Sequence, residues 1–229
     1  MSTREEMLGR IRAAVAAGAP LAGGCVPLEG DGPDLAVDGV PRRYRRTGDQ
    51  PPGSPAVLDV LVDRLEDYRA TVHRCAAADV ARAVRTALGD ARSVVVPPGL
   101  PDGTVDTAAP DAPEVVVDGR PEPLSAVALD RIDAVVTAAR VACAVTGTIV
   151  LDGEPDQGRR VITLIPDRHV VVLRAEQVVQ TWPETVALLE PTRPLTMISG
   201  PSATSDIELS RVEGVHGPRN LQVVIVDPA

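Results

Sequence analysis

The side chains best suited to chemistry gather near the C-terminus, in two polar, Gly-containing stretches within residues 199–219. The candidate ligand-binding residues there are Ser199, Gly200, Pro201, Ser202, Thr204, Asp206, Glu208, His216, Gly217 and Arg219. Successive backbone N–H groups and nearby hydroxyls can form a nest that holds a phosphate or a carboxylate. The alternative is a capped loop, in which a hydroxyl or Asp206 caps the following turn.

Acid–base chemistry has less support in this segment. Asp206 and Glu208 are two positions apart, so they face opposite ways in a strand and are not neighbours on a helix. A dyad of paired carboxylates is therefore not expected, and we assign no catalytic residue. His216 is flanked by glycines. It can donate a proton, contact a ligand, or bond to the backbone within a turn.

A second candidate is the triplet Thr146, Gly147 and Thr148, at a predicted junction between a helix and a strand. Glycine there lets a ligand or another backbone come close, and the flanking hydroxyls can donate to an anionic group. A tight turn that needs a positive φ is the other interpretation. We include the triplet among the predicted ligand-binding residues.

Several classes of site are excluded by composition. The 23 basic residues are all arginine, which excludes a Schiff-base lysine and a P-loop lysine. The 3 histidines and 3 cysteines are dispersed and form no Cys-x-x-Cys motif, so no metal or iron–sulfur site is expected on this chain alone. Neither a Gly-x-Ser-x-Gly elbow nor a Gly-x-Gly-x-x-Gly fingerprint occurs. We therefore expect no cofactor bound by this chain alone, and a small anion of unknown identity as its ligand.

Charge and hydropathy narrow the possible partners. The net charge of −9 argues against nucleic acid, whose binding proteins carry clustered positive charge. No apolar run approaches the roughly twenty residues of a membrane span. The N-terminal residues 1–6 lack the basic-then-apolar order of a signal peptide. These features predict a cytoplasmic protein without a membrane span.

The elements that must position these residues divide into two regions. Residues 1–53 are predicted as an N-terminal helix through about Ala17 and a Pro/Gly-rich connection, and residues 54–229 as an α/β domain. In the second region, β-branched runs alternate with helical stretches, which predicts a mainly parallel sheet covered on both faces. The predicted strands are 71–75, 93–96, 114–117, 134–137, 149–151, 169–173, 194–198 and 221–226.

The remaining patterns in this region are helical or ambiguous. Ser54-Pro55 is expected to begin a helix, and another is expected to run from Ala78 to Leu88 and stop at Gly89. A short helical stretch is predicted to lead to Ala144, and a further helix to span 182–190. Residues 161–165 fit a strand or a short helix. Because Phe is absent, the core must be built from Val, Leu, Ile and Ala.

Four motifs in order resemble the LUD-domain family, specifically its lactate utilization protein C group. The resemblance covers roughly residues 54–229 and is strongest from 133 to 227. In that family the triplet usually follows a glutamate, whereas Val145 stands here. The motifs are Thr146-Gly147-Thr148, Ile165-Pro166-Asp167-Arg168-His169, Ser199-Gly200-Pro201-Ser202 through Asp206-Ile207-Glu208, and Gly214-Val215-His216-Gly217-Pro218-Arg219.

The resemblance implies a fold and a pathway. The family is similar to the three-layer α/β/α superfamily that contains CoA transferases, ribose-5-phosphate isomerase and formyltetrahydrofolate cyclo-ligase. The resemblance implies a role in the oxidation of L-lactate to pyruvate, together with an iron–sulfur subunit and a cysteine-rich subunit. Since this chain lacks cluster ligands and a flavin fingerprint, we expect a ligand-binding partner subunit that is not catalytic alone.

Two other classes of function stay open. One is a stand-alone transferase or ligase that acts on an anionic substrate in the superfamily's cleft. Val145 and the missing lysine count against it. The other is a structural or regulatory scaffold that binds no ligand.

Overall fold

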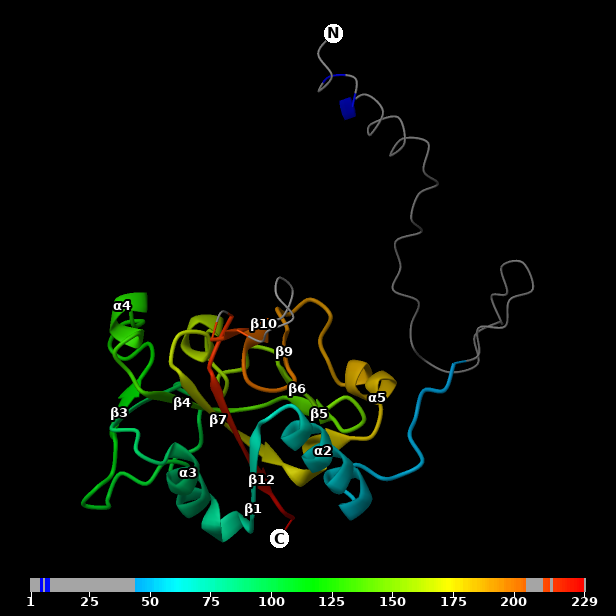
Figure 1. Cartoon of the computed structure of the whole chain (residues 1–229), viewed down its shortest axis with the longest axis horizontal. Coiled ribbons are helices and arrows are strands. Elements are labelled where there is room, and N and C mark those ends of the chain that lie inside the picture. Colours follow the sequence, from blue (N-terminus) through cyan, green and yellow to red (C-terminus); the bar gives the residue numbers. More distant parts are fainter. Residues whose placement is uncertain (1–4, 6, 9–43, 205–211, 215, 229) are drawn as a thin grey trace. The chain divides into compact units, whose positions relative to one another are not determined.

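A computed structural model describes residues 5, 7–8, 44–204, 212–214 and 216–228 of the chain (Figure 1). The chain divides into two units, Met1–Tyr44 and Arg45–Ala229. In the first unit the described residues are Glu5, Met7 and Leu8, which are helical, and Tyr44. The rest of the helix predicted through Ala17 lies outside the described residues, and the boundary placed between residues 53 and 54 stays a prediction.

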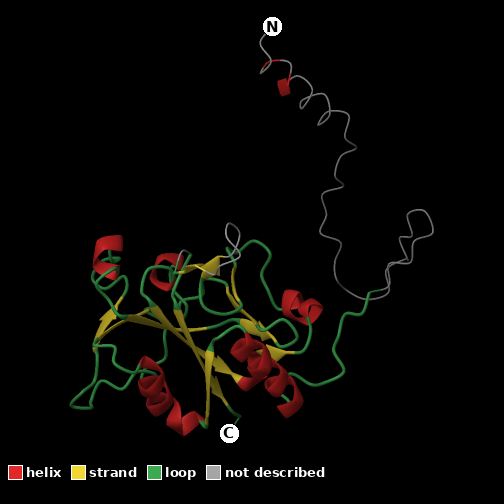
Figure 2. Ribbon diagram, in the orientation of Figure 1, coloured by secondary structure: helices red, strands yellow, loops and turns green. Residues whose placement is uncertain are grey.

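The second unit is built on a six-stranded sheet in which each neighbouring pair of strands is parallel (Figure 2). The strand order is β1-β12-β7-β4-β2-β3. This confirms the mainly parallel sheet expected from the sequence. The strands are β1 (Thr71–Cys75), β2 (Ser93–Val96), β3 (Glu114–Val117), β4 (Ala134–Ala138), β7 (Arg168–Arg174) and β12 (Asn220–Val226).

Helices cover both faces of this sheet, because alternate side chains along each strand point to opposite sides. Helix α2 (Pro55–Asp67) packs Leu61 and Leu65 against one face, which presents Val171 and Val223. Helix α3 (Val80–Leu88) packs against the opposite face. This arrangement confirms the predicted α/β fold.

A second, smaller sheet lies on the same side of the large sheet as α2, because its residues belong to the same core cluster as the helix. Its strand order is β8-β5-β6-β9, with β5 and β6 antiparallel, β6 and β9 antiparallel, and β5 and β8 parallel. The strands are β5 (Val141–Cys143), β6 (Thr148–Leu151), β8 (Val178–Val179) and β9 (Thr196–Ile198). Through β9, the small sheet places residues 196–202 above one face of the large sheet.

Short elements complete the described fold. They are the 3-10 helices η2 (Ala77–Asp79), η3 (Arg160–Thr163) and η4 (Ala175–Gln177), the helices α4 (Ala126–Leu129) and α5 (Trp182–Ala187), and a two-stranded hairpin of β10 (Ala203–Thr204) and β11 (Val212–Glu213). None of the helices in the described residues is long and apolar enough to cross a membrane.

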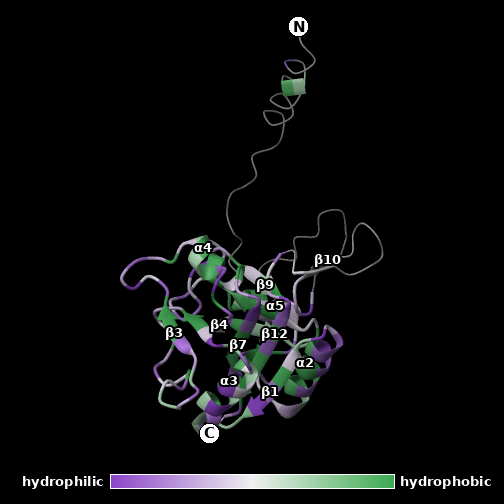
Figure 3. Ribbon diagram, turned by 60° about the vertical axis from the view of Figure 1, so that its left-hand side comes forward, coloured by the Kyte–Doolittle hydropathy of each residue, from purple (hydrophilic) through white to green (hydrophobic). Residues whose placement is uncertain are grey.

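The core contains small and branched aliphatic side chains, as the absence of Phe requires. Its largest fully buried apolar residues are Leu and Ile, with Val filling the strands. Hydrophobic positions, green in Figure 3, run along the strands of the large sheet. Val and Ile suit these strands because β-branched side chains pack well on a pleated surface buried on both faces.

The prediction of a helical stretch ending at Ala144 was wrong. Val141–Cys143 form strand β5, which is fully buried and pairs with both β6 and β8. Alanine favours helices, but helix propensity is a weak preference that tertiary burial overrides. The triplet at 146–148 therefore lies in the turn between two strands rather than at a helix-to-strand junction. The ambiguous run at 161–165 is mostly η3, and the last helix ends at Ala187, earlier than predicted.

The two strands that flank the C-terminal polar segment belong to different sheets. Strand β12 is central and mostly buried in the large sheet, whereas β9 is an edge strand of the small sheet and is only partly buried. The strand predicted at 194–198 is present at Thr196–Ile198. The sequence pattern also favoured a buried strand on each side of the polar segment, and that interpretation was wrong for β9. The polar segment therefore connects the two sheets.

Candidate functional site

Two adjoining cavities lie between the small sheet and the large one. The first, which we call the polar cavity, has a volume of about 310 Å³ and is lined by Ser199–Ser202 and His216–Pro218 together with His169 and Leu221. The second, the proline cavity, has a volume of about 530 Å³ and is lined by Leu151 and four prolines, Pro98, Pro123, Pro155 and Pro194. The two cavities share Arg160, Thr163 and Thr196 as wall residues, so together they form one groove.

The groove crosses one face of the parallel sheet. The polar cavity lies near the amino ends of β7 and β12, where His169 and Leu221 are the second residues of their strands. The proline cavity reaches the carboxyl ends of β2 and β3 through Pro98 and Asp118.

The structure brings together two of the predicted polar stretches. The Ser202 N–H donates to the Pro218 carbonyl at 2.8 Å, and the His216 N–H donates to the Ser202 hydroxyl at 2.9 Å. These bonds hold the 199–202 loop against the 216–218 loop along one wall of the polar cavity. The stretches at 199–206 and 214–219 were expected to form one cleft together with the triplet at 146–148. Ser199, Gly200, Pro201, Ser202, His216 and Gly217 line this cavity, and the triplet does not.

The triplet at 146–148 contacts this site without lining either cavity. The Thr146 hydroxyl donates to the Thr148 hydroxyl at 2.8 Å, and Thr148 Oγ1 lies 2.9 Å from the Ser199 hydroxyl oxygen. Thr148 is buried, so this chain of hydroxyls fixes the first residue of the polar loop from inside the protein. The triplet orients the loop and is not itself part of the cavity wall.

Gly147 has a role that involves α2. Its φ is +59°, and a Cβ at this position would lie 2.7 Å from the Cβ of Arg64. Both reasons proposed from the sequence, a left-handed turn and a close approach, therefore apply. The element that comes close is helix α2.

Substituting Gly147 with Ala is expected to lower the free energy of unfolding by roughly 1–3 kcal/mol, because it adds backbone strain and a clash with α2. Gly153→Ala is the matched control: φ there is +71°, and a Cβ would meet nothing within 4 Å. Urea unfolding of both variants separates the cost of backbone strain, which both share, from the cost of the clash with α2, which only Gly147→Ala has. An equal loss in the two would mean that contact with Arg64 contributes nothing.

Gly200 is also fixed by a neighbour. Its φ is +123°, and a Cβ would lie 2.8 Å from both the carbonyl oxygen and the Cβ of Tyr68. The residue after α2 therefore occupies the space beside the loop backbone. A side chain at 200 would displace the loop itself, so substitutions at Gly200 report on loop packing as well as on access to the cavity.

Four other predicted residues lie apart from the groove or outside the described residues. The Arg219 guanidinium pairs with Asp167 at 2.6 Å and lines a separate cavity at the amino ends of the large sheet. Thr204 lies in β10, where its backbone pairs with Val212. Asp206 and Glu208 lie outside the described residues.

Arg160, which sequence reasoning did not single out, lies between the two cavities. Its guanidinium donates to the Thr163 hydroxyl at 2.9 Å and reaches the His216 carbonyl at 3.5 Å. Partial removal from water lowers its pKa. Among the described residues, no carboxylate is within ion-pair distance of this guanidinium. A planar cation with spare donors at a cavity wall is suited to a carboxylate or a phosphate.

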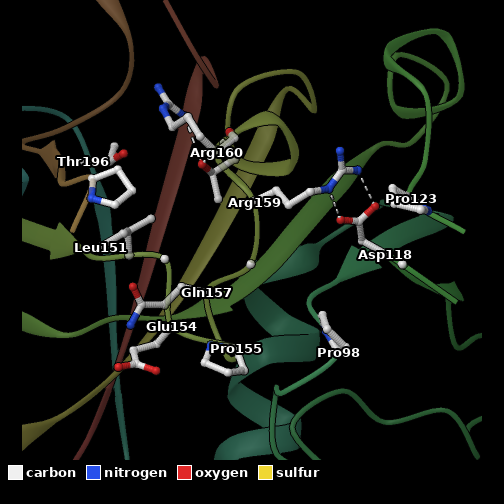
Figure 4. Close-up of a pocket in the computed structure, with 15 residues that line it drawn as sticks. Pro98, Asp118, Pro123, Leu151, Glu154, Pro155, Gln157, Arg159, Arg160 and Thr196 are labelled. Atoms are coloured by element: carbon white, nitrogen blue, oxygen red, sulfur yellow. Dashed lines mark hydrogen bonds and ion pairs between the residues drawn. The ribbon is translucent and has the colours of Figure 1, made fainter. Parts of the chain in front are cut away.

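Its neighbour Arg159 has a different role. Arg159 donates twice to Asp118, at 2.6 and 2.7 Å (Figure 4), and Asp118 is only 3% exposed. Asp118 also accepts from the Leu124 N–H at 3.0 Å. The hydrogen bonds from Arg159 hold the pKa of Asp118 below its ordinary value. This bidentate pair anchors the start of η3 to the end of β3, and so positions Arg160.

Asp118→Asn is expected to lower the free energy of unfolding at pH 7 by about 1–3 kcal/mol, since a charged hydrogen-bonded partner of Arg159 is lost. Because the pKa of Asp118 is depressed in the folded state, this stability is present above the ordinary carboxyl pKa. It disappears as the pH falls through the depressed value.

Urea unfolding at several pH values tests this: wild type and variant should converge in acid. Asp111→Asn is the matched control: the Asp111 carboxylate pairs with Arg85 but is exposed, so its loss should change stability far less. A constant difference at all pH values would contradict the linkage.

His169 provides a neutral imidazole at the floor of the polar cavity. It is 1% exposed, and its Nε2 lies 2.8 Å from the Thr137 hydroxyl oxygen. Burial, and secondly the charge of Arg160, lower its pKa to about 3. At neutral pH this group can accept or donate a hydrogen bond but carries no charge. No group of three His, Cys, Asp or Glu side chains within the described part of the chain is placed to hold a metal ion.

Comparison with known proteins gives the family. The LUD domain family model matches residues 58–226. The chain is 50% identical over 174 residues to a lactate utilization protein C of Deinococcus radiodurans, which covers 74% of this chain and 79% of that protein.

Two further relatives align over less than half of their own length. A lactate utilization protein C of Macrococcus caseolyticus is 31% identical, over 43% of this chain and 46% of that protein. An uncharacterized protein of Neisseria meningitidis is 33% identical, over 42% of this chain and 43% of that protein.

The fold has a solved counterpart. The chain is similar to the crystal structure of a DUF162 family protein from Deinococcus radiodurans, with a TM-score of 0.62 and 40% identity. The similarity covers 75% of this chain and 96% of the solved chain. The range of the family model contains the motifs at 146–148, 165–169, 199–208 and 214–219. The chain belongs to the LUD domain family.

Proposed function

We propose that this chain serves lactate utilization in the cytoplasm as a subunit that binds a small anion, beside iron–sulfur and cysteine-rich partner proteins. The observation that carries the proposal is Arg160, a guanidinium at the wall of two cavities with no carboxylate partner among the described residues. The name of the Deinococcus radiodurans relative supports the pathway.

The groove supports binding of a carboxylate more directly than it supports redox chemistry. A guanidinium can take a carboxylate in a bidentate pair, and the hydroxyls of Thr163, Ser199 and Ser202 stand nearby. The sequence has no Cys-x-x-Cys and no dinucleotide fingerprint. We therefore assign electron transfer to the partner proteins and ligand binding to this chain.

Calorimetric titration of the full chain with L-lactate and with pyruvate tests the binding. An assay with lactate and an artificial electron acceptor tests the division of labour: the chain alone should show no turnover. Addition of the iron–sulfur and cysteine-rich proteins should restore turnover, and the three should copurify. Turnover by the isolated chain would favour the alternative of a stand-alone enzyme, and failure to bind either acid would contradict the proposed ligand class.

A further inference from the structure

The two halves of the groove differ in chemistry. The polar cavity offers hydroxyls, backbone groups and the neutral imidazole of His169. The proline cavity is lined largely by carbon atoms, with contributions from four proline rings and Leu151. Figure 4 shows Pro98, Pro123, Pro155 and Leu151 around it. A single ligand that spans both cavities must therefore have a polar end and an apolar end.

The charged side chains in the groove indicate which end of the ligand lies in which cavity. Asp118 and Arg159 line the proline cavity, but each neutralises the other in a bidentate pair. Glu154, also in that cavity, is paired with Arg193. Arg160 is the remaining charged side chain among the described lining residues, and it lies where the two cavities meet. The anionic group of a ligand is thus expected at Arg160, and an uncharged body in the proline cavity.

The volumes of the two cavities also indicate a ligand with an apolar body. Cavities of about 310 and 530 Å³ fall in the range of roughly 300–1,000 Å³ that holds drug-sized ligands. Lactate and pyruvate, with three carbons each, can occupy the polar cavity but leave the proline cavity to water. Burial of apolar groups there would add affinity, at about 0.8 kcal/mol for each CH₂, or about fourfold in the dissociation constant.

We propose that the groove takes an amphipathic carboxylate, with its anionic head at Arg160 and an apolar body of several carbons in the proline cavity. The inference rests on the proposed function for the anionic head and extends it to the apolar body. Thr163 and Thr196 line both cavities, so the part of the ligand that joins the head to the body would lie beside them. Lactate and pyruvate are then minimal ligands of a larger site.

Calorimetry with three probes tests the ligand class on the full chain. Pyruvate supplies the head alone, 2-oxooctanoate the same head with a longer apolar chain, and 2-octanone a similar chain without the carboxylate. We expect 2-oxooctanoate to bind at least about tenfold more tightly than pyruvate, and 2-octanone to bind far more weakly than 2-oxooctanoate.

A pair of variants locates the apolar body. Pro194→Trp places a large ring at an exposed position that lines only the proline cavity, and should remove the advantage of 2-oxooctanoate. Pro191→Trp makes the same change at an exposed position that lines neither cavity, and should keep that advantage. The melting temperature of each variant checks its fold, and Pro123→Trp replaces Pro194→Trp if the latter fails to fold.

The outcomes separate this inference from the proposed function. If pyruvate and lactate bind but 2-oxooctanoate binds no more tightly, the inference is wrong and the proposed function stands. If none of the three acids binds, the proposed function fails and the inference fails with it. Equal affinity for 2-octanone and 2-oxooctanoate would mean that Arg160 holds no anion, and would overturn the inference.

Discussion

Replacing Arg160 with glutamine is expected to weaken the binding of lactate and pyruvate by about tenfold to a hundredfold. Glutamine keeps a polar side chain but removes the charge and the planar fork of donors. A hydrogen bond to a charged group contributes about 1.5–3 kcal/mol, which corresponds to that range of dissociation constants. Calorimetric titration of wild type and variant with each acid measures the loss.

The control is Arg131→Gln, which removes the same charge at an exposed position. Arg131 lines the separate cavity at the amino ends of the large sheet, so this change should leave the affinity for both acids near that of wild type. Both variants should melt close to wild type, because Arg160 bonds only to the Thr163 hydroxyl and the His216 carbonyl in the described structure. Equal weakening in both variants would mean that long-range charge, and not contact at the groove, governs binding.

The fold was largely predictable because its strands are short, β-branched and bounded by turn residues. β1 at Thr71–Cys75 and β2 at Ser93–Val96 have the predicted bounds. Helix α2 begins directly after Ser54, and α3 stops at Gly89, whose φ is +59°. In each of these cases the local pattern and the tertiary fold agree.

The small sheet was less predictable, because its strands depend on partners far away in the chain. β5 contains Ala142 and Cys143, which do not favour strands strongly by themselves. The strand forms because it pairs with β6 and β8 and is fully buried. Its misassignment also misplaced the triplet around Gly147, which lies in the turn of a hairpin.

The polar loops could be found from sequence, but Arg160 could not. Glycine, hydroxyls and proline between two strands mark a loop of unusual composition, and the loops at 199–202 and 216–218 share a cavity. Arg159 and Arg160 are adjacent and of identical type. Only the position of Asp118, at the end of a strand more than forty residues earlier, distinguishes the paired arginine from the one that faces the groove.

The Asp118 pair and the buried imidazole of His169 place opposite demands on this site. Asp118 must stay ionised to hold η3, whereas His169 must stay neutral to remain in the core. Both conditions hold at neutral pH. In the unfolded chain, falling pH protonates the imidazole before the carboxylate, since an ordinary histidine titrates near 6.5 and an ordinary aspartate near 3.8. Mild acid therefore isolates the contribution of His169.

Stability is expected to fall by about 1.4 kcal/mol for each pH unit below 6.5 on account of His169 alone. The unfolded chain binds a proton on this imidazole near pH 6.5, but the folded protein does not until about pH 3, because burial and the charge of Arg160 lower its pKa. Between these values the unfolded state holds more protons, so lowering the pH favours unfolding.

Urea unfolding of wild type, His169→Gln and Thr137→Val between pH 7 and pH 4.5 tests this dependence. Glutamine cannot titrate, so the free energy of unfolding of His169→Gln should decrease less steeply as the pH falls. The difference in slope should correspond to about one proton, whatever the stability of the variant at pH 7. Thr137→Val removes the hydrogen-bond partner at 2.8 Å but keeps the imidazole buried, so it should retain the wild-type slope. If His169→Gln loses stability with the same slope as wild type, the imidazole is already protonated in the folded protein. Arg160 would then face a second positive charge across the polar cavity.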